Sequence, residues 1–385
     1  MKLADRKHCT GCGACADACP AAIISMRTSE EGFLFPSVDE SRCMGCGICG
    51  KVCHALNPPE KRMPDKAFAA WTLDDSVRMS SSSGGVYSVL GEYVLENGGV
   101  ISGCRFDRDM VLKHELCDRP GCTGAFRGSK YVQCFTDGVY RKIKEELAAR
   151  KTVLFTATPC QAAGLLAFLG RPYENLITCD LVCHGIPSQK IFRSYLKRHE
   201  LSPDPDRDEI AFRDLKGWGD FYIRVSENGS LKWRSDDATN EFIRAFLSGC
   251  DYNEACYECP YAGMERVGDL TLADFWGLGK SVPFSGDASH GCSLVLVNTE
   301  KGRNLIQSVR DKLFLEERTL EEARQGNGQL RSPVQRPPMR DVFYRMDWAE
   351  IAGKINYGNP SPLRKLLRSC KRTVFRALGR NGGSR

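Results

Sequence analysis

The sequence lacks the long apolar segment that a transmembrane helix needs. Its most apolar run, residues 153–169, is interrupted by Thr156, Thr158, Pro159 and Gln161, whereas a spanning helix needs about 20 predominantly apolar residues. The chain also opens without the apolar stretch of a signal peptide. These absences predict a cytoplasmic protein, in which residues 153–169 form a buried strand, a turn and a helix.

Two further features are absent. Beyond residue 57 the chain has no G-x-G-x-x-G turn, which argues against a standard Rossmann nucleotide site. It also has no basic stripe with interleaved aromatic residues, so nucleic acid is not expected as a partner.

Acidic residues are missing from the C-terminal end, since none follows Glu350. Apolar side chains recur there at helical spacing, at Leu363, Leu366, Leu367, Cys370 and Val374. A basic amphipathic helix of this kind lies on anionic membranes or docks on a partner protein. The tail, residues 361–385, therefore suggests peripheral contact with the inner membrane face, the alternatives being an ordinary exposed helix or a disordered end.

Cysteine, in contrast, is abundant, with 20 residues in a chain of 385. A long chain without a secretion signal indicates metal binding rather than a disulfide scaffold. Eight of these cysteines form two matching runs, Cys9, Cys12, Cys15 and Cys19 followed by Cys43, Cys46, Cys49 and Cys53. Each run has the C-x2-C-x2-C-x3-C spacing of bacterial ferredoxins, in which the fourth cysteine ligates the other cluster.

We therefore predict two 4Fe-4S clusters with crossed ligation. One is assigned to Cys9, Cys12, Cys15 and Cys53, and the other to Cys43, Cys46, Cys49 and Cys19. Zinc sites or disulfides are the alternatives, but zinc is satisfied by C-x2-C pairs and does not require two matching runs.

The pattern after the cysteine runs changes twice. Residues 1–57 form the predicted ferredoxin-type domain, and a proline-rich linker follows at residues 57–64. Strands and helices then alternate to about residue 199, which predicts a parallel α/β sheet with its ligand at the carboxyl ends of the strands. Strand patterns dominate beyond Asp206. The fold class is therefore α+β and α/β, with regions at 66–150 and 151–345 that together form an α/β flavin-binding domain with a β-rich C-terminal part.

A third group of cysteines is a candidate metal site. Cys256 and Cys259 follow Cys250 closely, and Cys160 or Cys183 would supply a fourth thiolate to an iron–sulfur cluster. Zinc and unligated thiols remain as alternatives. Cys160 lies just inside a predicted helix N-terminus, a position that lowers a thiol's pKa and suits a ligand or a redox thiol; a buried core cysteine is the alternative. Four scattered cysteines, Cys104, Cys117, Cys122 and Cys134, have no predicted role.

The segment at residues 80–85 is serine- and glycine-rich, and it precedes a helix expected from Gly84 to Asn97. Such a helix start offers hydroxyls and free N–H groups to a diphosphate, although the serines would equally serve as a simple helix cap. The candidate cofactor-binding residues are Ser82, Ser83, Gly84, Gly85, Lys130 and Gln161. His184 follows a strand and is a candidate proton donor, or else a structural histidine.

Six motifs occur in one order along residues 66–300. They are Ser81-Ser82-Ser83-Gly84-Gly85, Gly128-Ser129-Lys130-Tyr131, Thr158-Pro159-Cys160-Gln161, Cys183-His184-Gly185-Ile186-Pro187-Ser188, Cys256-Tyr257-Glu258-Cys259, and Gly268-Asp269 through Asp274-Phe275-Trp276-Gly277. With them the chain resembles the bacterial branch of the coenzyme F-420 hydrogenase/dehydrogenase beta-subunit family, preceded by a dicluster ferredoxin domain. The resemblance implies an FAD-binding α/β protein that moves electrons between iron–sulfur centres and a two-electron acceptor.

The chemistry of the cofactors is consistent with that function. Clusters carry single electrons and cannot deliver hydride, whereas a flavin bridges one- and two-electron steps. The sequence thus predicts an iron–sulfur flavoprotein oxidoreductase, with ferredoxin or another redox protein as partner and a small molecule such as coenzyme F-420 as acceptor. His184 and Cys160 are the catalytic candidates. The alternatives are an electron-transfer subunit without its own flavin, and a scaffold whose clusters are structural.

Overall fold

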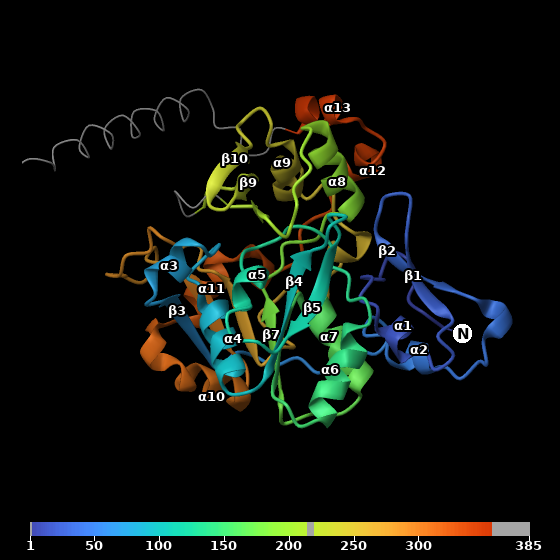
Figure 1. The fold of residues 1–385 in the computed structure, drawn as a ribbon, viewed down its shortest axis with the longest axis horizontal. Helices are drawn as coiled ribbons and strands as arrows, with labels where there is room; N and C mark the ends of the chain where they lie inside the picture. Colours follow the sequence, from blue (N-terminus) through green and yellow to red (C-terminus); the bar gives the residue numbers. More distant parts are fainter. Residues whose placement is uncertain (1, 214–218, 356–385) are drawn as a thin grey trace, which may run out of the picture.

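The computed structural model describes residues 2–213 and 219–355 (Figure 1). The predicted amphipathic tail at 361–385 lies outside the described residues. Within them, no helix is both long and apolar enough to cross a membrane.

The N-terminal cysteine runs lie in a small unit of their own, at the edge of the molecule in Figure 1. It contains the antiparallel strands β1 (Ile24–Thr28) and β2 (Leu34–Val38), the short helices α1 (Ala14–Ala18) and α2 (Ile48–Lys51), and a 3-10 turn at Glu40–Arg42. Both helices begin after a glycine with positive φ, Gly13 at 78° and Gly47 at 73°. Other residues rarely adopt this conformation, so these glycines permit the tight turns between consecutive cysteines.

An eight-stranded mixed sheet forms the centre of the molecule. Its strands, in spatial order, are β13 (Leu313–Arg318), β3 (Lys66–Thr72), β12 (Ser293–Val297), β11 (Leu270–Asp274), β7 (Leu176–Leu181), β6 (Val153–Ala157), β4 (Val100–Phe106) and β5 (Leu112–Cys117). The central strands β4, β6, β7 and β11 run parallel, whereas the pairs towards both edges are antiparallel.

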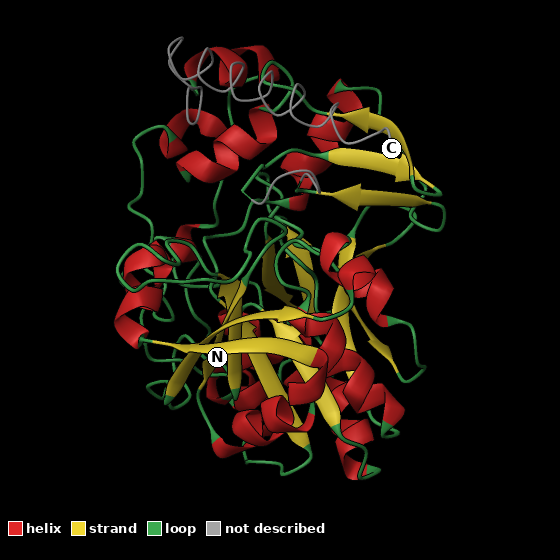
Figure 2. Cartoon of the chain, turned by 90° about the vertical axis from the view of Figure 1, so that its left-hand side faces the viewer, coloured by secondary structure: helices red, strands yellow, loops and turns green. Residues whose placement is uncertain are grey.

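The predicted parallel sheet is therefore correct for its centre and wrong for its edges. Strands β11, β12 and β13 lie in the predicted β-rich C-terminal part, yet they join the same sheet as β3 to β7. A hairpin of β9 (Arg224–Glu227) and β10 (Ser230–Arg234) turns at Asn228-Gly229, and with β8 (Asp208–Ala211) it forms a second, three-stranded sheet. Figure 2 shows this small sheet beyond one end of the large one.

Helices cover both faces of the large sheet. One face packs on α4 (Val86–Glu96) and α10 (Glu300–Ser308), in a core that includes Leu154 and Val295. The other packs on α6 (Val139–Ala148) and α7 (Pro159–Leu169), in a core that includes Phe155. Leu154 and Phe155 are adjacent on β6 and point to opposite faces, as the alternation of side chains along a strand requires.

The remaining helices complete the molecule. They are α3 (Asp75–Met79), α5 (Thr123–Phe126), α8 (Gln189–Arg198), α9 (Glu241–Ser248), α11 (Leu320–Gly326), α12 (Arg340–Phe343) and α13 (Trp348–Lys354), with 3-10 turns at Glu254–Cys256, Arg310–Lys312 and Gly328–Leu330. Helices α8, α9 and α13 pack with the small sheet around an aromatic core that includes Phe192 and Phe242. This lobe lies beyond the carboxyl ends of the central parallel strands (Figure 2).

Two helices bear directly on the site. Helix α7 begins at Pro159 and ends before Gly170, which has φ of 67°, as the Thr158-Pro159 start and the Gly170 stop predict. Helix α4 begins later than expected, after Gly85 with φ of 77°, and no side chain caps it. The expectation that serines cap this helix is wrong, since Ser81 Oγ donates to the carbonyl of Val77 instead.

Candidate functional site

The eight N-terminal cysteines line two small cavities. Cys9, Cys12, Cys15 and Cys53 surround one of them. Cys19, Cys43, Cys46 and Cys49 surround the other. The fourth cysteine of each run thus lies with the first three of the other run, and this arrangement supports the crossed ligation expected from the spacing.

Desolvation makes free thiolates unfavourable at the first of these cavities. It raises the pKa of Cys9 to about 11 and that of Cys15 to about 12. A buried anion requires a compensating cation, and cluster iron supplies one. The thiols around this cavity therefore fit an iron–sulfur centre.

The cavity of Cys9, Cys12, Cys15 and Cys53 lies against the central domain. Thr136 Oγ1 donates to the carbonyl of Cys12 at 3.0 Å, and Gln133 Nε2 donates to the carbonyl of Thr10 at 3.3 Å. On α7, a Cβ added to Gly164 would lie 3.0 Å from Cys12 Sγ. Only a glycine at this position lets the cysteine approach the helix so closely.

Four further cysteines come together beyond α7. Cys160 lies in the first turn of that helix, Cys183 follows β7, and Cys256 and Cys259 lie in and after a 3-10 turn. Desolvation and the charges of Cys183, Cys259 and Cys160 raise the pKa of Cys256 well above its usual value. Both Cys160 and Cys183 therefore approach the Cys256–Cys259 pair, where the sequence suggested one or the other.

The expected low pKa of Cys160 is wrong. Desolvation raises it to about 11, against a smaller opposing effect of a hydrogen bond with Thr158. The same cause raises the pKa of Cys183 to about 12. Cys250 belongs to a different environment, since it lies in the aromatic core and accepts a hydrogen bond from Ser248 Oγ at 3.0 Å.

A histidine that the sequence reasoning missed links the two groups of cysteines. His54 Nε2 is hydrogen-bonded to Thr10 Oγ1 at 3.0 Å, and its Nδ1 to the hydroxyl of Tyr261 at 2.8 Å. Thr10 also lies near enough to Cys160 to lower the pKa of its thiol slightly. Desolvation lowers the pKa of His54 to about 4, so the ring is neutral at pH 7. Its position directly after Cys53 was the available signal.

The main cavity has a volume of about 660 Å³ and lies at the carboxyl ends of β6, β7 and β11. Its lining includes Ser82, Ser83, Gly85, Lys130, Cys160, Gln161 and His184, so it gathers most of the predicted cofactor and catalytic residues. Gly84 is not in this lining: its N–H donates to Ser293 Oγ at 3.0 Å, and an added Cβ would lie 2.2 Å from the carbonyl oxygen of Ala70. Gly84 therefore serves close packing.

One wall of the cavity offers donors for an anion. The first turn of α4 reaches it through Gly85, Val86 and Ser88, and uncapped N–H groups at a helix N-terminus bind phosphates. Arg127, which the sequence reasoning missed, lies beside this turn and donates to Ser88 Oγ at 3.0 Å and Ser80 Oγ at 2.6 Å.

Lys130, a predicted cofactor-binding residue, is held by backbone carbonyls although it lines the cavity. Its Nζ donates to the carbonyls of Phe126 at 3.1 Å, Arg127 at 3.0 Å and Gly128 at 3.3 Å. Desolvation lowers its pKa. The ammonium thus stabilises the turn after α5, and Arg127 is better placed as the cation for an anionic ligand.

His184 lies in a defined tautomer. Tyr252 donates its single hydroxyl proton to the carbonyl of Phe246 at 2.5 Å, so its oxygen accepts from His184 Nδ1, also at 2.5 Å. Desolvation lowers the pKa of His184. The neutral ring then carries its proton on Nδ1, which leaves Nε2 as an acceptor rather than the donor that the sequence suggested.

The opposite wall combines charge with aromatic rings. Arg213 forms an ion pair with Asp274 and donates from Nε to the Tyr131 hydroxyl at 2.7 Å. Its guanidinium stacks over Phe221, 4.0 Å from the ring centroid. Arg213, Phe221 and Trp276 all line the cavity. Arg213 belongs to none of the sequence motifs, so the sequence alone did not identify it.

Two of the cysteines without a predicted role, Cys104 and Cys134, also line this cavity. Cys117 and Cys122, the other two, form a disulfide bond.

Comparisons with known proteins match two parts of the chain. Residues 8–56 match the 4Fe-4S dicluster domain, and residues 150–323 match the family that comprises the C-terminal part of the coenzyme F420 hydrogenase/dehydrogenase beta subunit. These matches confirm the resemblance that the six motifs and the cysteine runs suggested. No curated protein matches the chain.

Among solved structures, the chain is similar to one from a xenon derivative of the F420-reducing nickel–iron hydrogenase complex of Methanosarcina barkeri. The identity is 16% and the TM-score 0.47, over 76% of this chain and 89% of that one.

Proposed function

We propose that the protein is an iron–sulfur flavoprotein oxidoreductase, because the chain belongs to the coenzyme F420 hydrogenase/dehydrogenase beta-subunit family and carries a dicluster domain. Electrons would enter the dicluster domain from ferredoxin or another redox protein and reach a two-electron acceptor, such as coenzyme F420 or another organic substrate, at the main cavity. The observation that carries the proposal is that Cys160 and Cys183 belong to the four-cysteine group and also line that cavity.

The four-cysteine group of Cys160, Cys183, Cys256 and Cys259 fits a third iron–sulfur centre. Desolvation raises the pKa of each of these thiols, so thiolates persist there only with metal cations beside them. Zinc is the alternative, but among the described residues no three of these sulfurs lie within 4.8 Å of one another. A redox centre is favoured because the group lies between the dicluster domain and the cavity.

The contacts around α7 provide a short connection between the dicluster domain and this group. Cys12 lies against Gly164 of α7, and Thr10 lies near Cys160 at the start of the same helix. His54 joins Thr10 to Tyr261, two residues after Cys259. These residues hold the two groups of cysteines at a fixed separation.

The main cavity fits a flavin dinucleotide in size and chemistry. Its volume is within the range of about 300–1,000 Å³ that is usual for ligand sites. The N-terminus of α4 and Arg127 would bind the diphosphate, and Phe221 and Trp276 provide apolar surface for a ring. FAD, when bound, links one-electron and two-electron chemistry. His184 Nε2 would accept or hold a proton at the same cavity.

An electron-transfer subunit without its own flavin is the second candidate. The observation that favours it is the engagement of Lys130, the one cation that the sequence predicted for the cofactor, with three backbone carbonyls. A separate catalytic protein would then receive the electrons.

Flavin quantification in the full chain, purified and reconstituted with FAD under anaerobic conditions, separates the two candidates. The flavoprotein predicts about one FAD per chain. Gly85→Val, directly before α4, should reduce the FAD content to near zero. A φ of 77° strains valine, and its Cβ would lie 2.9 Å from Thr72 Cγ2.

Arg127→Gln should weaken FAD binding about 10- to 100-fold, since a hydrogen bond to a charged group contributes about 1.5–3 kcal/mol. Arg171→Gln, on the loop after α7, is the matched control and should bind FAD normally. Iron and sulfide must equal the wild-type content in each variant, which shows that the chain has folded. Absence of flavin from the wild type would favour the electron-transfer subunit.

A further inference from the structure

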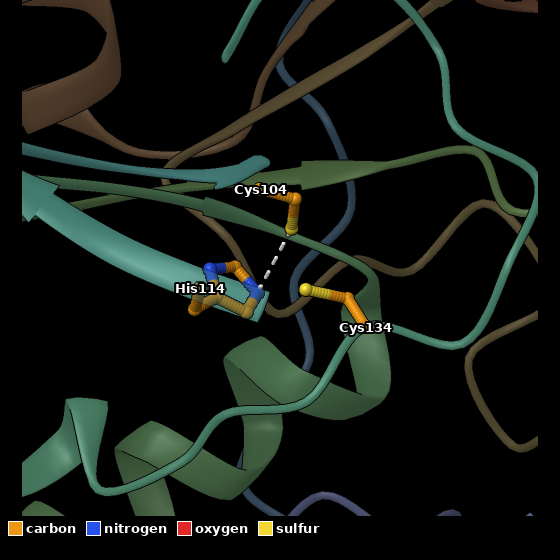
Figure 3. A group of neighbouring side chains, drawn as sticks. All are labelled: Cys104, His114 and Cys134. Carbon is orange, nitrogen blue, oxygen red and sulfur yellow. Dashed lines mark hydrogen bonds between the residues drawn. The ribbon is translucent and has the colours of Figure 1, made fainter. Parts of the chain in front are cut away.

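We propose that Cys104, His114 and Cys134 bind a zinc-like divalent cation at the wall of the main cavity (Figure 3). The site is separate from the ferredoxin-type cysteines and from the four-cysteine group, and its argument does not depend on a bound flavin.

The backbone brings the three residues together. Cys104 on β4 lies directly opposite His114 on β5 in the antiparallel register. The segment that carries Cys134 is fixed to β5 by two backbone hydrogen bonds, from His114 N–H to the Phe135 carbonyl at 2.8 Å and from Phe135 N–H to the Leu112 carbonyl at 2.9 Å. Gln161 Nε2 also donates to the carbonyl of Cys134 at 2.8 Å. The ligands are therefore held by ladder contacts rather than by mobile loops.

The three ligand atoms have the spacing of a metal site. Cys104 Sγ lies 3.5 Å from His114 Nε2, and the two sulfurs and this nitrogen all lie within 4.8 Å of one another. Tetrahedral zinc with Zn–S of about 2.3 Å and Zn–N of about 2.0 Å separates its ligand atoms by about 3.5–3.8 Å. Figure 3 shows the two sulfurs and the imidazole pointing toward one another.

The imidazole of His114 is oriented as metal-binding histidines are. Its Nδ1 is hydrogen-bonded to Ser102 Oγ at 3.2 Å, and its ring stacks on Phe155 with centroids 5.2 Å apart. A hydrogen-bond partner on Nδ1 orients the ring so that Nε2 faces the two sulfurs. The side chains of His114 and Ser102 are both buried, so this orientation is shielded from water.

The fourth position of the site is on the cavity side. Cys104, Cys134 and Gln161 all line the cavity, and Gln161 Oε1 lies 3.3 Å from His114 Nε2. Three protein ligands with a fourth position open to a cavity are the arrangement of zinc sites that bind water or substrate. Two thiolates would also neutralise the dication, which a buried site requires.

A redox pair of Cys104 and Cys134 is the competing arrangement. Such a pair involves only the two sulfurs. It does not explain why the His114 ring points at them or why Ser102 holds the ring there. The three-donor geometry therefore favours the cation.

The test is X-ray absorption at the zinc edge on the full chain, purified anaerobically and supplied with Zn²⁺ alone, because iron–sulfur clusters do not contribute there. We expect about one zinc per chain with two sulfurs at about 2.3 Å and one nitrogen at about 2.0 Å. Cys134→Ser and His114→Ala should each lose this zinc while iron and sulfide stay at wild-type levels. Cys292→Ser, at a buried cysteine directly before β12, should retain it.

Three results would overturn the proposal. One is the absence of zinc from the wild type after addition of Zn²⁺. Another is zinc bound by four sulfurs, which would place it in the other cysteine groups. The third is a Cys104–Cys134 disulfide in the purified protein, detected by mass spectrometry after thiol alkylation, which would establish the redox pair.

Discussion

Burial, more than helix position, sets the chemical state of the cysteines. Cys160 has the helix N-terminal position that lowers a thiol's pKa, yet desolvation raises the pKa to about 11. The pKa values of Cys9 and Cys15 are raised for the same reason. Without a metal, each of these thiols would therefore be protonated at pH 7, and each becomes a thiolate only with a metal centre beside it.

The ligation of the two N-terminal clusters can be tested at single residues. Cys53→Ala should remove the cluster of Cys9, Cys12 and Cys15, because Cys53 lines their cavity. It does not line the cavity of its sequence neighbours Cys43, Cys46 and Cys49. Iron should fall by about four atoms per chain, the content of one cubane. Electron paramagnetic resonance of the reduced protein would identify which cluster is lost.

Cys19→Ala is the matched control, since it should remove the other cluster and leave the first. If Cys53→Ala and Cys43→Ala removed the same cluster, the crossed assignment would be wrong.

At the scale of elements, α7 connects the dicluster domain to the main cavity. Gly164 makes this contact possible, since an added Cβ would lie 3.0 Å from both Cys12 Sγ and the Tyr140 hydroxyl. Replacement of an open helical glycine by alanine normally stabilises a helix by up to about 1 kcal/mol, whereas overpacking costs about 1–3 kcal/mol.

Gly164→Ala should therefore lower the thermal midpoint of the anaerobic protein and slow electron transfer out of the dicluster domain. Gly353→Ala on α13 is the matched control, because nothing lies within 4 Å of its added Cβ, and its midpoint should stay the same or rise. Equal midpoints and equal transfer rates for the two variants would show that Gly164 is not needed for the contact between Cys12 and α7.

The sequence was informative where signals are local. The limits of α7 followed from Thr158-Pro159 and Gly170, and the ferredoxin runs from cysteine spacing alone. The mixed sheet could not be predicted, because β11 and β12 have the same apolar pattern whichever neighbour they pair with. Likewise, only the register of β4 and β5 places Cys104 opposite His114. Arg127 has no motif of its own and is identified by the turn of α4 that it contacts.

At the scale of the whole molecule, the cysteine groups and the cavity form a series. The cavity of Cys19, Cys43, Cys46 and Cys49 lies in the same unit as that of Cys9, Cys12, Cys15 and Cys53, and the latter contacts α7. The four-cysteine group follows and reaches the main cavity through Cys160 and Cys183. This order motivates the proposed direction from a protein partner to a small acceptor, or its reverse.

The most direct test is the rate at which bound FAD is reduced when the reconstituted full chain is mixed anaerobically with reduced ferredoxin. The clusters should bleach first and the flavin afterwards. Cys256→Ser, with FAD still bound, should slow flavin reduction at least about tenfold while the ferredoxin-type clusters reduce normally. Flavin reduction at the wild-type rate in Cys256→Ser would contradict the proposed route through the four-cysteine group.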